Sequence, residues 1–216
     1  MLNDGYVIAV QLKAIDIYSM NWIQHPVVLE GTRVKLVPLE DKYFDELIAL
    51  STNKDVWEFL SIPGYEPDTL RTELRSAVLK RMTGEEYPFI IIDKVADKVI
   101  GCTRYLDIHP QHRKLEIGWT WYDKAYWATG YNTECKYLLL THCFETLKTI
   151  RVQLRTWDKN MRSRKAIEKI GGQFEGILRH ERIRYDGTVR STSVFSIIDD
   201  EWPGVKQMLE GKLTMS

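Results

Sequence analysis

The sequence lacks an excess of charge of either sign, because its 30 lysine and arginine residues equal its 30 aspartate and glutamate residues. A field strong enough to recruit nucleic acid or an anionic membrane is therefore not expected. The sequence also lacks any apolar run close to the ~18 residues that a membrane-spanning helix needs. These absences predict a small molecule or a peptide end as the partner, with no nucleic acid and no membrane.

Cysteine is scarce, and its spacing does not indicate disulfide bonds. The three cysteines, Cys102, Cys135 and Cys143, are odd in number and show no short paired spacings. The N-terminus carries Asp4 where a secretion signal would be basic, and its apolar stretch over residues 7–10 is too short for one. A reducing cytoplasm is therefore the expected location.

The length of 216 residues suits one domain with a substantial core. Residues 1–24 differ in character from the rest, so we predict an N-terminal extension followed by a single domain over residues 25–216. Met20-Asn21-Trp22 resembles a second start of translation. Residues 1–19 are thus either a native arm or no part of the native protein.

The hydrophobic pattern predicts strands and helices in the first half of the chain. A strand pair or a single bent strand is predicted at residues 27–38, and short helices are predicted at residues 40–50 and 55–60. Three consecutive strands are predicted at residues 87–93, 97–106 and 114–122. Asp68 is expected to cap a further helix, whose apolar stripe runs from Leu70 to Met82.

In the second half of the chain, the same pattern predicts a helix at residues 132–147, a strand at 150–157 and a helix at 160–171. A hairpin follows at residues 174–198, and a final helix begins after Asp200. Asn160 is expected to cap its helix, and Asp186-Gly187 is typical of a two-residue hairpin turn. This order predicts an α+β (mixed α/β) domain whose sheet contains a parallel crossover.

The segment that joins the strand at residues 114–122 to the helix at residues 132–147 predicts an anion site. A helix N-terminus has unpaired backbone N–H groups and a partial positive charge. Ala128 and Gly130 are small, so the backbone can approach a phosphate closely. Taken alone, the segment is equally compatible with an ordinary strand-to-helix connection.

Three segments carry a family resemblance: Glu116-Ile117-Gly118-Trp119-Thr120-Trp121, Trp127-Ala128-Thr129-Gly130-Tyr131-Asn132, and Asn160-Met161-Arg162-Ser163 with Glu168-Lys169-Ile170-Gly171. They resemble the GNAT acetyltransferase superfamily, in the branch of the ribosomal-protein N-terminal (Rim-type) acetyltransferases. The resemblance covers about residues 28–209. It implies a GNAT-type acyl-CoA N-acyltransferase fold, in which helices flank a central, splayed, mixed sheet.

The resemblance also implies acetyl-CoA as the acetyl donor. The acyl-pantetheine arm is expected along the strand that carries Trp119, Thr120 and Trp121, and against Asn160 and Ser163. The pyrophosphate is expected on the loop formed by Trp127, Ala128, Thr129, Gly130, Tyr131 and Asn132. Backbone N–H groups of residues 129–132 would hold it, so side-chain identity can vary there.

The chain departs from the superfamily pattern at four positions, one of which is Gly172 in place of a usual phenylalanine. Trp127 stands where arginine or glutamine is common, and Asn132 replaces a final glycine or alanine. Ile167 stands where many members carry a tyrosine that protonates the departing thiolate. In the Rim branch a serine takes that role, so the resemblance implies Ser163 as the proton donor. An exposed first-turn serine is the alternative.

A general base must remove a proton from the acceptor ammonium. Glu116 is the first candidate and Glu181 the second, with a solvated strand-edge carboxylate as the alternative for each. An α-amine with a pKa near ~8 needs little help, so a water-mediated base suffices. His109 and His112 provide only half of a metal site, and no metal is predicted.

We interpret the sequence as an acetyl-CoA-dependent N-acetyltransferase. The acceptor is a primary amine, either a protein N-terminus or a small molecule, which attacks the thioester directly in a ternary complex. A non-catalytic acyl-CoA-binding regulatory module is the alternative. The resemblance also implies that a homodimer is common in this branch.

Overall fold

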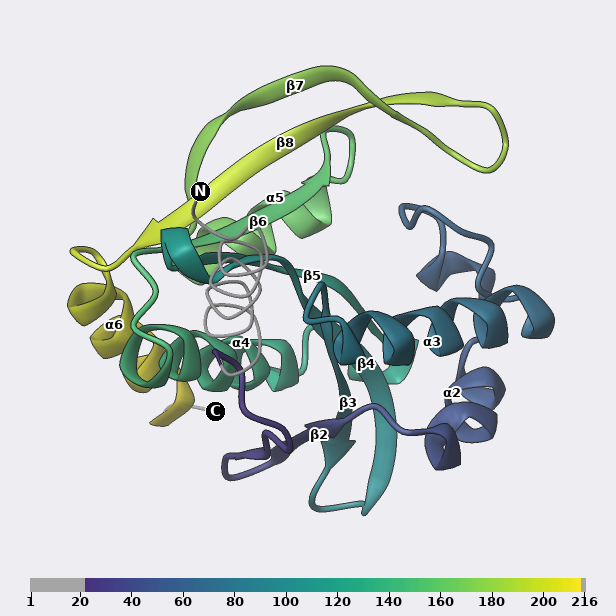
Figure 1. Cartoon of the computed structure of the whole chain (residues 1–216), viewed down its shortest axis with the longest axis horizontal. Coiled ribbons are helices and arrows are strands. Elements are labelled where there is room, and N and C mark those ends of the chain that lie inside the picture. The colour runs from purple at the N-terminus through teal and green to yellow at the C-terminus, as the bar shows by residue number, and fades with distance from the viewer. Residues whose placement is uncertain (1–21, 215–216) are drawn as a thin grey trace, which may run out of the picture.

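The computed structural model describes residues 22–214, in which eight strands form one mixed sheet (Figure 1). In spatial order the strands are β1 (Leu29–Glu30), β2 (Val34–Pro38), β3 (Tyr87–Asp93), β4 (Lys98–His109), β5 (Lys114–Tyr122), β6 (Arg151–Trp157), β8 (Val189–Ile198) and β7 (Gln173–Ile183). Neighbouring strands are antiparallel except β5 and β6, which run parallel.

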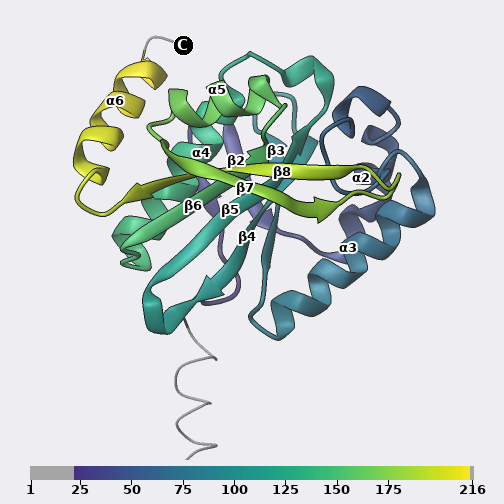
Figure 2. The same cartoon turned by 90° about the horizontal axis from the view of Figure 1, so that it is seen from above.

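Helices pack on both faces of this sheet (Figure 2). One face is covered by α2 (Phe44–Leu50) and α3 (Pro67–Met82), and the other by α4 (Tyr131–Thr141), α5 (Met161–Lys169) and α6 (Trp202–Thr214). A π-helical segment, His142–Thr146, continues α4. Because β3 lies between two helical layers, its residues are apolar on both sides: Phe89 and Ile91 pack towards α4, and Ile90 packs towards α3.

The predicted strands and the parallel crossover are confirmed, with three local corrections. The helix predicted at residues 55–60 is wrong, because only a 3-10 helix at Lys54–Val56 forms there and residues 57–60 are turns and a bend. Asp68 is not the helix cap: α3 begins at Pro67 after Glu66, and Asp68 lies in its first turn. This start follows the preference for proline in the first turn, where a missing N–H costs nothing.

The hairpin turn is longer than the predicted two residues. Strand β7 ends at Ile183 and β8 begins at Val189. The carbonyl of Arg184 accepts from the N–H of Gly187 at 3.0 Å, and Gly187 has a φ of 82°. The N–H of Arg184 also donates to the carbonyl of Thr188 at 2.9 Å, so these two residues pair and residues 185–187 form the loop. The turn is therefore a three-residue loop that closes with a glycine in the left-handed region.

The predicted extension over residues 1–24 lies mostly outside the described residues. Of its last residues, Trp22 donates a hydrogen bond from Nε1 to the carbonyl of Leu147 at 3.0 Å. Trp22 and Ile23 also pack against the core. The domain boundary at residue 25 stays a prediction.

Candidate active site

Strands β5 and β6 separate soon after they pair, and this separation opens the site. They are paired only from Lys114↔Arg151 to Glu116↔Gln153. Beyond these positions β6 pairs with β8 alone, so residues 117–122 of β5 have no strand partner on the β6 side among the described residues. A cavity of about 820 Å³ lies at this opening.

The loop before α4 lies at one end of this cavity, where Ala128 and Asn132 line the wall. Gly130 is the N-cap of α4, with a φ of 91°, and Ala128 has a φ of 60°. In residues 22–214 no acceptor is found for the N–H groups of Thr129, Gly130, Tyr131 and Asn132. Four free donors at the positive end of a helix can bind a phosphate group.

Two arginines flank this loop. Arg33 reaches it from the β1–β2 turn: its Nη1 donates to the carbonyl of Thr129 at 3.4 Å, and its guanidinium lies 4.9 Å from the Tyr131 ring centroid. Arg162 of α5 stacks at 3.7 Å over the ring of Trp127 and lines the cavity. Arg33 also pairs with Glu134, at 3.5 Å between Nε and Oε2, so Arg162 contributes more to the attraction for an anion.

The start of α5 contributes two of the predicted residues to the cavity wall. Asn160 caps the helix as predicted, because its Oδ1 accepts from the N–H of Ser163 at 3.0 Å. The Ser163 hydroxyl has no hydrogen-bond partner among the described residues. Ile167 is buried at 7% exposure, so it offers no polar group in place of the family's tyrosine.

A β-bulge distorts β5 beside the cavity. Cys102 of β4 pairs with Trp121 and Arg104 pairs with Gly118, so Trp119 and Thr120 together oppose a single residue. Trp119 has a φ of 53° at this bulge. The Trp121 ring packs in the core, 5.0 Å from that of Trp57.

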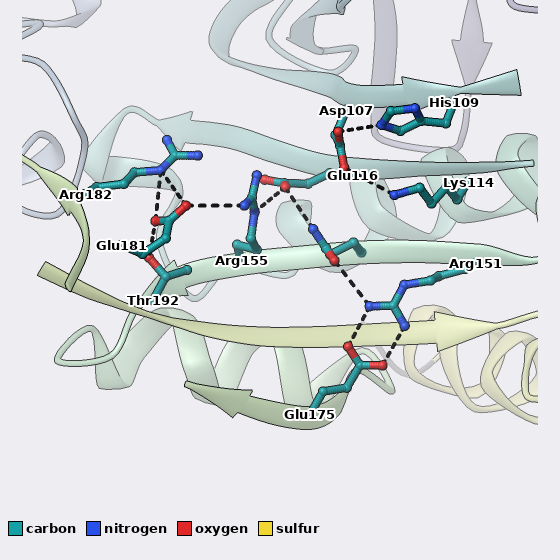
Figure 3. A network of polar contacts seen from close by, with 11 residues as sticks. Asp107, His109, Lys114, Glu116, Arg151, Arg155, Glu175, Glu181, Arg182 and Thr192 are labelled. Atoms are coloured by element: carbon teal, nitrogen blue, oxygen red, sulfur yellow. Dashed lines mark hydrogen bonds and ion pairs between the residues drawn. The ribbon is translucent and has the colours of Figure 1, made fainter. Parts of the chain in front are cut away.

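Both candidate bases belong to one polar network (Figure 3). Glu116 Oε2 accepts from Arg155 Nε at 2.5 Å, and Arg155 Nη1 lies 3.5 Å from Glu181 Oε1. The Glu116 side chain is only 7% exposed, so its description as a solvated strand-edge carboxylate is wrong. Its Oε1 has no hydrogen-bond partner among the described residues, which leaves one oxygen able to accept a proton.

Glu181 is held more tightly than Glu116. It accepts from Thr192 Oγ1 at 2.9 Å and pairs with Arg182. Burial acts to raise the pKa of Glu181, but Thr192, Arg182 and Arg155 together hold it below its ordinary value. A low pKa weakens a general base, and Glu181 lies outside the cavity wall that Glu116 lines, so both observations disfavour Glu181 as the base.

The cavity brings most of the predicted site residues together. Those that line it are Glu116, Trp119, Thr120, Trp121, Trp127, Ala128, Asn132, Asn160 and Ser163. Thr129, Gly130, Tyr131 and Glu181 are not part of its wall. Of these, Tyr131 turns its ring towards Tyr126, at 5.0 Å, and Arg33.

The β7–β8 hairpin extends across the opening and contacts the segment between α2 and α3 (Figure 1). Arg184 Nη2 donates to the carbonyl of Glu58 at 2.8 Å, and Arg190 Nη1 donates to the carbonyl of Phe59 at 3.4 Å. Phe59 and Arg190 both line the cavity. The hairpin therefore forms part of the wall opposite α4.

Several polar residues of this site escaped sequence reasoning. Arg33, Arg155 and Arg190 meet their partners only through the tertiary fold. Lys136 did leave a signal in the sequence, because it interrupts the apolar positions of α4 beside Cys135 and Leu139. It is buried and lines the cavity.

The opened parallel pair, the free N–H groups and the flanking arginines are features that an elongated, phosphate-bearing ligand would require. A family model described as an acetyltransferase (GNAT) domain matches residues 33–173. The chain belongs to the GNAT acetyltransferase family. Its sheet and flanking helices form the mixed α/β fold of that family.

Relatives agree with this assignment. The chain is 29% identical to a GCN5-related N-acetyltransferase from Brucella melitensis, with a TM-score of 0.80 over 87% of this chain and 86% of that one. It is 26% identical to the "Uncharacterized N-acetyltransferase p20" of Bacillus licheniformis, over 81% of this chain and 97% of that protein. RimL, a ribosomal L7/L12 alpha-N-protein acetyltransferase, shares the fold, with a TM-score of 0.72 at 16% identity over 81% of this chain and 96% of that one.

The three cysteines of this GNAT domain are free and buried. Burial raises the pKa of Cys102 and Cys143 to about 12 and also raises that of Cys135. The apolar surroundings of Cys135 therefore outweigh the helix N-terminus, as its apolar stripe predicted.

Two kinds of feature are absent from residues 22–214. No group of three or more histidine, cysteine, aspartate or glutamate side chains is placed to hold a metal ion. His109 pairs instead with Asp107, at 2.8 Å between Nε2 and Oδ1. No helix in the same range has the length and apolar character needed to cross a membrane.

Proposed function

We propose that this GNAT enzyme transfers an acetyl group from acetyl-CoA to a primary amine. The observation that supports the donor most directly is the set of free N–H groups at residues 129–132, at one end of a cavity that continues along the open edge of β5. A pyrophosphate suits the N–H groups, and an extended amide-bearing arm suits the unpaired strand edge. These proposed contacts are made by backbone groups. They are therefore compatible with Trp127 and Asn132, two side chains that differ from the superfamily pattern.

In this proposal the amine attacks the thioester directly, with donor and acceptor bound together. Glu116 accepts the amine proton through its unpartnered Oε1, directly or through water. Ser163 supplies a proton to the leaving thiolate from the cavity wall, in place of the tyrosine that Ile167 replaces. Each cysteine is buried with a raised pKa, so none is suited to carry the acetyl group.

The acceptor is either a protein N-terminal amine or a small-molecule amine. The fold shared with RimL supports the first choice by analogy only, because one scaffold serves many substrates. We further propose a cytoplasmic location, which three free cysteines favour. Assignment to the Rim branch and a homodimeric state stay predictions.

The deciding experiment offers acetyl-CoA to the protein with a panel of small amines and N-terminal peptides and measures free thiol. We expect thiol release with at least one member of the panel and mass-spectrometric evidence of the acetylated amine. Calorimetry should show acetyl-CoA binding in the absence of an acceptor. Binding without turnover across a broad panel would favour the non-catalytic acyl-CoA-binding module, and absence of binding would refute both.

A further inference from the structure

Lys136 is a buried cation without a counterion. It lies in the second turn of α4, is 6% exposed, and forms no ion pair with any described residue. Within the described chain, its Nζ has a single hydrogen-bond acceptor, Thr120 Oγ1, at 2.7 Å. The remaining ammonium N–H groups have no acceptor, and the side chain lines the cavity.

This arrangement is unfavourable for stability. Burial lowers the pKa of Lys136 to about 8, and the groups that oppose this shift are only the thiols of Cys135 and Cys143. A lysine in the interior normally pairs with a carboxylate, because an unpaired buried charge loses its hydration without compensation. Such a group is expected where function needs it.

The position of Lys136 indicates what that function is. Thr120, which accepts from Lys136, is one of the two bulge residues of β5. The hydroxyls of Thr120 and Thr103 are 2.7 Å apart, and Thr103 Oγ1 donates to the carbonyl of Gly118 at 3.4 Å. The ammonium is therefore anchored beside the bulge, at the strand edge that borders the cavity.

We propose that Lys136 stabilises the negative charge that develops on the thioester oxygen during acetyl transfer. The inference rests on the proposed function, since it requires an acyl-CoA thioester on the open edge of β5. No described carboxylate neutralises the ammonium, so its field acts on the cavity. Lys136 itself is buried, which strengthens the interaction.

The chemical step balances as follows. The amine nitrogen forms a bond to the carbonyl carbon, and the C=O π electrons move to the oxygen beside Lys136. The C=O bond then re-forms, the C–S bond breaks, and the thiolate leaves with a proton from Ser163, which regains a proton from solvent water. The amine proton passes to Glu116, which releases it to solvent, so both groups return to their starting state. Lys136 keeps its proton throughout and contributes charge alone.

The test uses Lys136→Met, which keeps the length of the side chain and removes its charge. We expect kcat to fall by ~10²–10³-fold, the effect of losing one oxyanion-stabilising group. We expect the Kd for coenzyme A to change less than threefold, roughly, because the pyrophosphate loop is unaffected. The melting temperature should stay the same or rise, because a buried unpaired charge is removed. Lys148→Met, at an exposed lysine just after the π-helical segment, is the matched control and should leave all three values unchanged.

A spectroscopic measurement separates this role from structural support of the bulge. The carbonyl stretch of bound acetyl-CoA, labelled with ¹³C at the carbonyl, should lie at lower frequency in the parent than in Lys136→Met. A cation near the oxygen polarises the C=O bond, whereas a side chain that only supports the β5 bulge does not. Lys148→Met should match the parent spectrum.

The outcomes are distinct. If the parent transfers acetyl groups and Lys136→Met folds with unchanged kcat, or if the carbonyl frequency does not move, Lys136 has no such role. A variant that melts lower and loses coenzyme affinity and kcat together shows a structural role and also overturns the proposal. If the parent neither binds nor consumes acetyl-CoA, the proposed function fails first.

Discussion

Gly130 holds a backbone conformation that a residue with a side chain adopts only under strain. Its φ is 91°, and a Cβ placed there would lie 2.8 Å from Arg33 Nη2. The same residue supplies one of the free N–H groups at the start of α4. Local strain and loss of anion binding would therefore arise together from one substitution.

We predict that Gly130→Asp weakens acetyl-CoA binding. The change adds strain and places a carboxylate beside the proposed pyrophosphate position. Each charge-assisted contact that is lost, one or two in all, should reduce the binding free energy of acetyl-CoA by about 1.5–3 kcal/mol. Isothermal titration calorimetry measures the change, and circular dichroism confirms that the variant folds. Equal affinities in a folded variant and the parent would contradict the pyrophosphate assignment.

A second prediction concerns proton transfer. Glu116→Gln and Ser163→Ala should each lower kcat while sparing coenzyme affinity, with a loss nearer to ~10²-fold than to ~10⁴-fold because an α-amine loses its proton readily. Raising the pH should partly rescue Glu116→Gln, since more of the acceptor is then neutral. Glu175→Gln is the control: it alters the same polar network through Arg151 but lies outside the cavity wall. No rescue at high pH would argue against Glu116 as the base.

Local patterns predicted some site residues and could not predict others. Gly130 and Asn160 could be placed because the start of a helix depends on neighbours within a few residues. Lys136 and Arg155 depend on Thr120 and Glu116, which are 16 and 39 positions away in the sequence. The burial of Glu116 is likewise a property of packing, and a short motif cannot reveal it.

At the scale of elements, strands and helices followed from hydrophobic periodicity, and most errors fell at their ends. Pro67 rather than Asp68 opens its helix, and Gly187 closes a longer turn than the Asp186-Gly187 pair indicated. Turn length depends on how the two strands meet, which the pair alone does not specify. The contact between the β7–β8 hairpin and the segment before α3 had no sequence signal, because Arg184 and Glu58 are 126 residues apart.

This hairpin contact yields a third prediction. Arg184→Met removes the bond to the Glu58 carbonyl and the stacking at 5.0 Å over Trp157. We expect the KM for the acceptor to rise several-fold, because the wall formed by Phe59 and Arg190 loses support, while the Kd for acetyl-CoA is unchanged. Steady-state kinetics with an acceptor from the panel and calorimetry measure the two effects.

The control for this prediction lies on the same hairpin. Arg179→Met replaces an exposed β7 side chain that has no partner among the described residues. It should leave the KM for the acceptor unchanged. A larger loss of acetyl-CoA affinity than of acceptor affinity in Arg184→Met would show that the hairpin supports the donor end instead.

For the whole molecule, the half-buried His142 links folding to pH. Its Nδ1 lies 3.2 Å from the Tyr105 hydroxyl, and burial lowers the pKa of His142 to about 4. In the unfolded chain a histidine has a pKa near ~6.5. As the pH falls from the unfolded to the folded pKa, the unfolded state binds more protons, so stability decreases across this window.

We therefore predict that His142→Gln flattens the decline of melting temperature between pH 6.5 and about 4. Glutamine has no proton to gain there and can still hydrogen-bond to Tyr105. Burial also lowers the pKa of His25, so the informative quantity is the difference between variant and parent at each pH, measured by thermal denaturation. Parallel curves would show that His142 does not carry the effect.

The opening between β5 and β6 has an evolutionary consequence. It arises where one strand turns from its parallel neighbour to another partner, and the proposed donor contacts are backbone N–H groups. Neither feature requires particular side chains. Substitutions can therefore accumulate around the proposed acetyl-CoA site while the backbone there keeps its shape. RimL, which retains the fold at 16% identity, illustrates how far sequences can diverge on this scaffold. If the acceptor lies against the cavity wall that contains Phe59 and Arg190, as we propose, new substrates can be acquired there without loss of the donor.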